Sequence, residues 1–126
     1  MRAVDTNVLV RLVTRDDRTQ VAAAESFISK GAWVSTLVLV EAVWVLAAVY
    51  ELTDRQLTTA IDMLLHHRDL TIQDSVTVAA ALENYRRHPA LGFSDCLILE
   101  AARKAGHLPL GTFDRNLGKL DGAEKL

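Results

Sequence analysis

Four carboxylates stand at positions where they could act together as ligands of a divalent metal ion: Asp5, Glu41, Asp95 and Asp114. Carboxylate oxygens are hard ligands, and without accompanying His or Cys they favour Mg²⁺ or Mn²⁺ over Zn²⁺. The four histidines follow no metal-ligand spacing, and the single cysteine, Cys96, has an acidic neighbour that disfavours a reactive thiolate. We therefore interpret Cys96 as a core residue, and these residue types indicate metal chemistry on carboxylates.

Glu41 has the most unusual sequence context of the four acids. It lies in residues 37–50, LVLVEAVWVLAAVY, where the other side chains are apolar, and this pattern predicts a helix that is buried on every side. A buried carboxylate costs several kcal/mol unless something compensates its charge. No Lys or Arg lies within one helical turn of Glu41, so either a distant cation or a metal ion must compensate it.

The other three acids each have a simpler interpretation. Asp5, Asp95 and Asp114 precede or begin predicted helices, where a carboxylate caps free amide groups and stabilises the helix by about 0.5–2 kcal/mol. Capping explains each of these acids alone. It does not explain a Glu inside an apolar helix, and four anions that converge repel one another unless a cation joins them.

Strands and helices alternate along the chain. Short apolar runs predict strands at residues 1–4, 32–35, 70–72 and 108–112, with a short edge strand at 122–126. Apolar residues at helical spacing predict helices at residues 8–13, 21–30, 37–50, 53–68, 74–87 and 94–106, and a last helical turn at 115–120. Thr53 and Gln56 have the spacing of a capping box, and Ser94 is the predicted N-cap of its helix.

This alternation is typical of an α/β fold with a mainly parallel sheet and helices on both faces. Such sheets bind ligands outside the carboxyl ends of their strands. Asp5 and Asp114 follow strands, while Glu41 and Asp95 lie near the starts of helices that the topology places at the same end. We therefore expect the four acids to converge.

Length and charge set further bounds. A chain of 126 residues fits one domain, residues 1–126. The net charge is −2, from 14 basic and 16 acidic side chains, but four carboxylates committed to a metal would leave 14 basic against 12 acidic groups. Net charge therefore does not exclude a nucleic-acid partner. No segment suits a signal peptide or a membrane span, so we expect a cytoplasmic protein without membrane contact.

Four motifs in order resemble the PIN-domain ribonucleases, and among them the VapC toxins of toxin-antitoxin pairs. The motifs are Asp5-Thr6-Asn7, Val40-Glu41-Ala42, Phe93-Ser94-Asp95 and Gly111-Thr112-Phe113-Asp114. The resemblance covers essentially the whole chain. It implies a single PIN-like domain whose five-stranded sheet has the order 3-2-1-4-5, with helices on both faces.

The resemblance also implies a function, that of a divalent-metal-dependent endoribonuclease. Asp5, Glu41, Asp95 and Asp114 would hold Mg²⁺ or Mn²⁺ and carry the hydrolysis of RNA phosphodiester bonds. The groups that would orient these ligands are Thr6, Asn7, Thr112 and Asn116. Many PIN domains have a further acid just after the fourth one, where this chain has Asn116, so either one or two metal ions are compatible with the sequence.

The partners implied are an RNA substrate, a VapB-like antitoxin and a second copy of the chain in a homodimer. Candidates for contact with RNA phosphates, chosen from their positions in the chain, are Arg86, Arg87 and Arg115. Two alternatives stay open. A Mg²⁺-binding phospho-acceptor receiver domain has a similar length and fold class, but it pairs two acids after its first strand, where Asp5 has no acidic neighbour. A catalytically silent PIN scaffold would not need all four acids.

Overall fold

Three short strands in the first part of the chain form a parallel sheet in the computed structural model, which describes all 126 residues. They are β1 (Arg2–Ala3), β2 (Ala32–Val34) and β3 (Leu70–Ile72). β2 lies between the other two, with Arg2 opposite Ala32 and Ala32 opposite Leu70. Parallel neighbours cannot be joined by a tight hairpin, and helices make the crossover connections here.

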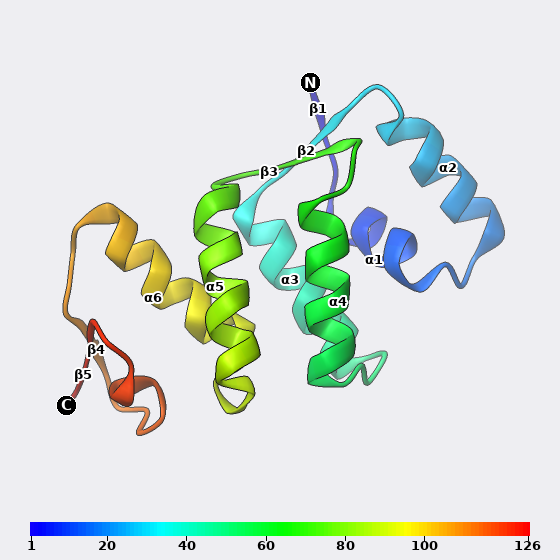
Figure 1. Ribbon diagram of the computed structural model, residues 1–126. Helices are drawn as coiled ribbons and strands as arrows, with labels where there is room; N and C mark the ends of the chain where they lie inside the picture. The colour runs from blue at the N-terminus through cyan, green and yellow to red at the C-terminus, as the bar shows by residue number, and fades with distance from the viewer. The chain divides into compact units, whose positions relative to one another are not determined.

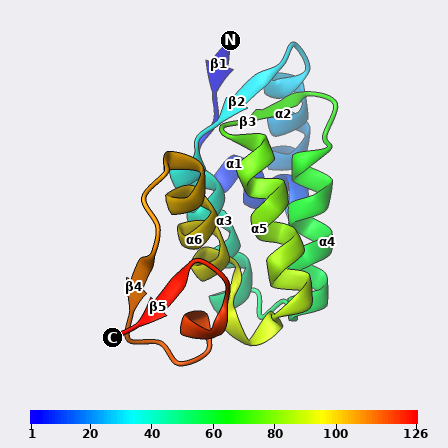
Figure 2. The same cartoon turned by 60° about the vertical axis from the view of Figure 1, so that its left-hand side comes forward.

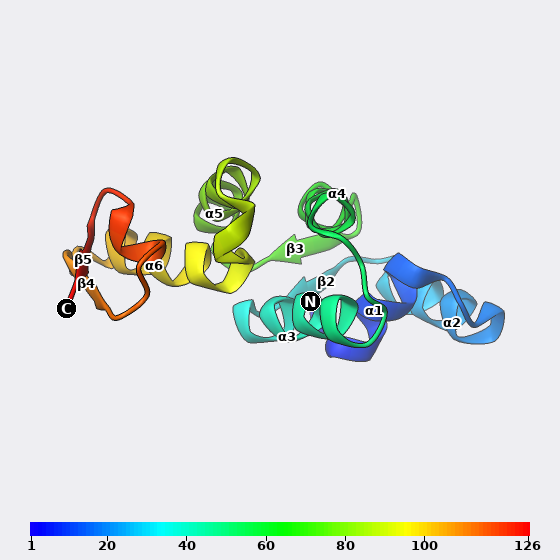
Figure 3. The same ribbon diagram turned by 90° about the horizontal axis from the view of Figure 1, so that it is seen from below.

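Four helices accompany this sheet. They are α1 (Thr6–Thr14), α2 (Arg18–Ile28), α3 (Thr36–Ala48) and α4 (Asp54–Leu65). Figure 3 shows α4 on one side of the strands and α1, α2 and α3 on the other, and α1 packs against both α2 and α3. The largest fully buried side chains here are Leu9, Val10, Ile28, Val34, Leu39, Leu46, Ile61 and Leu64.

The chain divides into two compact units, residues 1–75 and 76–126, and the elements above make up the first (Figure 1). The second contains α5 (Ser75–Arg87), η1 (Pro89–Leu91), α6 (Phe93–Ala105), β4 (Leu110–Thr112), η2 (Leu117–Lys119) and β5 (Ala123–Lys125). β4 and β5 pair in parallel, with Leu110 opposite Ala123, and η2 lies against β5 (Figure 2).

The predicted fold class, α/β with parallel sheets, is confirmed. The strands form a three-stranded sheet, β1-β2-β3, and a two-stranded sheet, β4-β5. The structure does not show the expected single five-stranded sheet. Neighbours within each sheet agree with the order 3-2-1-4-5, including the short final strand. The pairing of strands one and four, and the single domain 1–126, stay predictions.

Helix α3 corrects the prediction of a helix buried on every side. Only one face is buried, through Leu39, Ala42, Val43 and Leu46, while Leu37 is 74% and Trp44 65% exposed. Glu41 is itself exposed. Apart from Thr36 and Glu41, the residues of α3 are apolar, so its sequence lacks the polar stripe that normally marks the outer face of a helix.

Two predicted helix starts have different outcomes. The capping box is confirmed, since the Thr53 hydroxyl accepts the Gln56 N–H at 3.2 Å and the Gln56 side chain accepts the Thr53 N–H at 2.9 Å. Ser94 is not an N-cap, because α6 already begins at Phe93 after Gly92. Gly92 has a φ of 78°, a conformation that glycine adopts without strain.

Candidate active site

Asp5 lies just beyond β1 and is the N-cap of α1. Its Oδ1 accepts a hydrogen bond from the Val8 N–H at 3.3 Å. The side chain is exposed, and it makes no other hydrogen bond or ion pair. Capping occupies one oxygen and leaves Oδ2 available, so the capping role and a metal-binding role are compatible at this residue. Of the neighbouring groups expected to orient it, Thr6 is half-buried in the first turn of α1 and Asn7 is exposed.

Glu41 lies in the second turn of α3 and has neither a hydrogen bond nor an ion pair. Because the carboxylate is exposed, water solvates it. The prediction that burial of Glu41 requires a compensating cation was therefore wrong. Leu37 and Trp44 lie one turn before and one turn after Glu41 on the same face of α3. The structure therefore places this acid in an exposed and otherwise apolar stripe.

Asp95 lies in the first turn of α6, and packing fixes the start of that helix. Phe93, which is 3% exposed, packs against Tyr85 of α5 with ring centroids 6.3 Å apart. Asp95 is half-buried and makes no hydrogen bond or ion pair. Partial burial, and secondly the charge of Asp114, raise the pKa of the Asp95 carboxyl above its ordinary value. The acid therefore lies close to another carboxylate without any cation to offset it.

Asp114 follows β4 and is held by three hydrogen bonds in the turn that leads to η2. Its N–H donates to the Thr112 hydroxyl at 3.0 Å. Its Oδ1 accepts the N–H groups of Asn116 at 2.8 Å and Leu117 at 2.9 Å. Like Asp5, Asp114 uses one oxygen for the local backbone and keeps Oδ2 available. Thr112 fixes the backbone of Asp114, and Asn116 contributes its backbone N–H.

The structure brings Asp95 and Asp114 together within the second unit, where their charges interact. Asp5 and Glu41 belong to the first unit. Neither unit by itself gathers three or more His, Cys, Asp or Glu side chains into a metal-binding group. The convergence of all four acids on one metal site therefore stays a prediction.

The three arginines predicted to contact RNA differ in their surroundings. Arg86 lies 3.4 Å from Glu83 in an ion pair on the surface of α5. Arg87 and Arg115 are exposed and have no ion pair or hydrogen bond. The latter two are therefore the cations that a phosphate could reach without first breaking an existing contact.

Sequence reasoning missed Phe113 as a candidate contact residue. Its side chain is 81% exposed, although the residue stands between Thr112 and Asp114 in the predicted site motif. An aromatic residue inside a polar motif at a strand end was the available signal. Cys96, in contrast, is fully buried, and burial together with Asp95 and Glu100 raises its pKa to about 11, which makes the thiol a poor nucleophile.

Comparison with known proteins adds one finding to this geometry. A family model described as PIN domain matches residues 2–123. The matched region contains all four candidate acids. No curated protein and no solved structure matched the chain. No helix reaches the combination of length and apolar character that crossing a bilayer requires.

Proposed function

The chain belongs to the PIN-domain family, whose members are generally nucleases, and from that premise we propose that it is a divalent-metal-dependent endoribonuclease. The observation that carries the proposal is the family match over residues 2–123, which spans four acids in the motif order of a nuclease site. We further propose that the protein is the toxin of a VapBC-type pair. The receiver-domain alternative receives no support from the family match.

The chemistry of the donor set supports a hard divalent cation. The charge of Asp114 disfavours ionisation of Asp95, and neither carboxylate has an ion pair. Asp5 and Asp114 each use one oxygen for backbone amides and keep the other available. Carboxylate oxygens with open lone pairs are the ligands that Mg²⁺ and Mn²⁺ prefer. With Glu41, these residues would hold the ion.

A divalent cation bound there would supply the Lewis acidity that activates water and stabilises the leaving oxygen of a phosphodiester. The chain's own contribution is position. The Thr112 hydroxyl fixes the Asp114 backbone, and the amides of Asn116 and Leu117 fix its carboxylate through Oδ1. Asp5 is fixed in the same way by the first turn of α1. Ligands held in this manner lose little freedom when a cation binds.

The surroundings of Asp114 support RNA as the substrate class. Phe113 offers an exposed ring on which an unpaired base can stack, and such stacking tolerates any base sequence. Arg115, the residue after Asp114 in the sequence, is an exposed cation without an ion pair. A single strand that places a phosphate near Asp114 would therefore meet a stacking surface and a positive charge.

The exposed stripe of α3 supports the proposal of an antitoxin. Leu37 and Trp44 are large apolar side chains on either side of Glu41, and exposed apolar groups of this size mark interaction surfaces. An antitoxin segment packed on them would cover Glu41 and keep RNA away from the site.

We also propose that the protein forms a homodimer. Light scattering at micromolar concentration tests this proposal, and a strict monomer would contradict it.

Incubation of the purified protein with total cellular RNA tests the nuclease proposal. We expect cleavage with Mn²⁺ or Mg²⁺, no cleavage with excess chelator, and no cleavage by Asp5→Asn purified in the same way. Mapping of the cut ends would identify the RNA. If the parent protein leaves all RNA intact in both metals, the chain is a catalytically silent PIN scaffold and the proposal is wrong.

A further inference from the structure

A second feature of the 76–126 unit lies next to the turn that follows Asp114. Between η1 and η2 the surface forms a hollow of about 370 Å³. Ligand-binding cavities in proteins commonly occupy about 300–1,000 Å³, so the hollow has room for a small organic group. Its lining combines apolar residues, among them Pro89, Leu91 and Leu120, with cationic side chains.

The charged side chains that line this hollow are all positive. Arg87 and Lys119 line it, both are exposed, and neither has an ion pair or a hydrogen bond. No Asp or Glu is among the lining residues. Two cations that no acid neutralises attract an anion, and a guanidinium beside an ammonium group suits the oxygens of a phosphate. The apolar part suits a flat ring, because Pro89, Leu91 and Leu120 offer no charge that must stay hydrated.

The hollow is connected to the candidate metal ligands through Asn116. This residue lines the hollow, and its N–H donates to Asp114 Oδ1 at 2.8 Å. The short helix η2, which begins at Leu117, carries Lys119 from that turn to the hollow. A ligand in the hollow would therefore lie next to the turn that holds Asp114.

We propose that this hollow binds one nucleotide of the RNA substrate, next to the phosphodiester that is cut. The base lies against the apolar part, and Arg87 and Lys119 bind the adjoining phosphate. This inference rests on the proposed nuclease function and adds a substrate subsite to it. A mononucleotide has the same chemistry, so the test must distinguish a free nucleotide from a nucleotide within RNA.

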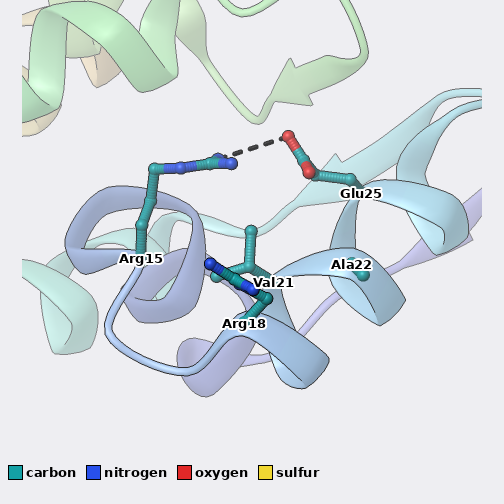
Figure 4. Close-up of a pocket in the computed structure, with 5 residues that line it drawn as sticks. All are labelled: Arg15, Arg18, Val21, Ala22 and Glu25. Carbon is teal, nitrogen blue, oxygen red and sulfur yellow. Dashed lines mark hydrogen bonds and ion pairs between the residues drawn. The ribbon is translucent and has the colours of Figure 1, made fainter.

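Another hollow of about 340 Å³, between α1 and α2, provides a contrast (Figure 4). There Glu25 pairs with Arg15 at 3.2 Å, so an acid already neutralises one of its two arginines. Arg18 also lines it and has no ion pair. Arg18→Gln is therefore a matched control, because it removes an exposed arginine from a hollow of similar size that we do not assign to RNA.

The test measures binding of a fluorescein-labelled single-stranded RNA in chelator, where cleavage cannot occur. We expect the double variant Arg87→Gln/Lys119→Gln to raise Kd at least roughly tenfold and to lower the slope of log Kd against log salt by about 0.7, since one phosphate contact with a single strand contributes that amount. Arg18→Gln should bind like the parent protein. Melting temperatures identify any variant that has lost its fold.

Three results would overturn the inference in different ways. If the double variant binds RNA like the parent while the parent cleaves RNA with Mn²⁺, the subsite is wrong and the nuclease proposal stands. If uridine monophosphate competes as tightly as the RNA itself, the hollow is a site for free nucleotides. If the parent neither binds nor cleaves RNA, the nuclease proposal fails and the subsite fails with it.

Discussion

Single carboxylates in this protein combine two tasks that are often treated as alternatives. Asp114 accepts two backbone N–H groups on its Oδ1, and Asp5 accepts one backbone N–H group on its own Oδ1. These bonds stabilise the start of a helical segment and also fix the direction of the second oxygen. A carboxylate that caps a helix is thus already positioned as a ligand, and capping does not argue against a metal site.

Thr112→Val tests how far the position of Asp114 matters. The substitution removes the hydroxyl that accepts the Asp114 N–H at 3.0 Å and keeps the shape of the side chain. We expect RNA cleavage to fall roughly 10- to 100-fold, the usual effect of losing a group that orients a metal ligand. Thr112→Ser retains the hydroxyl and should restore most of the activity. A Thr112→Val variant as active as the parent would exclude a positioning role.

Asp95→Asn should stabilise the metal-free protein at neutral pH. Because burial and Asp114 raise the pKa of Asp95 above its ordinary value of 3.8, the folded protein keeps this proton to a higher pH than the unfolded chain does. Ionisation of Asp95 therefore lowers the free energy of unfolding. The full loss is present at pH values above the pKa of the folded protein, and no loss remains well below pH 3.8.

Thermal melts of the parent and Asp95→Asn in chelator measure this cost. We expect the Tm of the variant at pH 7 to be higher by roughly 1–3 °C. For a domain of this size, that shift corresponds to a gain of a fraction of a kcal/mol in the free energy of unfolding. The difference should shrink as the pH falls toward 3. A variant that melts several degrees below the parent at pH 7 would instead show that the Asp95 charge stabilises the fold.

At the scale of elements, sequence patterns predicted most of the helices and strands. They failed where polar and apolar residues do not mark separate faces of an element. The capping box at Thr53 and Gln56 has an unambiguous spacing and is present. The apolar stretch around Glu41 has no polar stripe, so its exposed face could not be predicted. The N-cap of α6 was predicted two residues too late, at Ser94, because Gly92 with its positive φ ends the preceding turn.

Thr53→Ala tests the contribution of a cap to α4. The substitution removes the hydroxyl that accepts the Gln56 N–H. Loss of a Thr N-cap costs about 1 kcal/mol, which corresponds here to a fall in Tm of roughly 3–5 °C. Thr53→Ser keeps the hydroxyl and should melt within about 1 °C of the parent. Equal melting of the Ala and Ser variants would show that the capping box contributes nothing measurable.

At the scale of the whole molecule, each of the two units carries two of the four candidate acids. Asp5 and Glu41 are in residues 1–75, and Asp95 and Asp114 are in residues 76–126. The α/β alternation predicted that all four lie at the carboxyl ends of strands or near the starts of helices, and their positions along the elements agree. Sequence could not predict the exposure of Glu41, Phe113 or the cations, because exposure depends on tertiary packing.

The central proposal is that Asp5, Glu41, Asp95 and Asp114 each contribute to one metal-dependent cleavage reaction. The most direct measurement is the initial rate of Mn²⁺-dependent cleavage of one labelled RNA by the parent and by Asp5→Asn, Glu41→Gln, Asp95→Asn and Asp114→Asn, each confirmed as folded by its melt. We predict that every variant loses more than roughly 100-fold, beyond the effect of losing an orienting group. A folded variant from either unit that cleaves at the parental rate would contradict the claim.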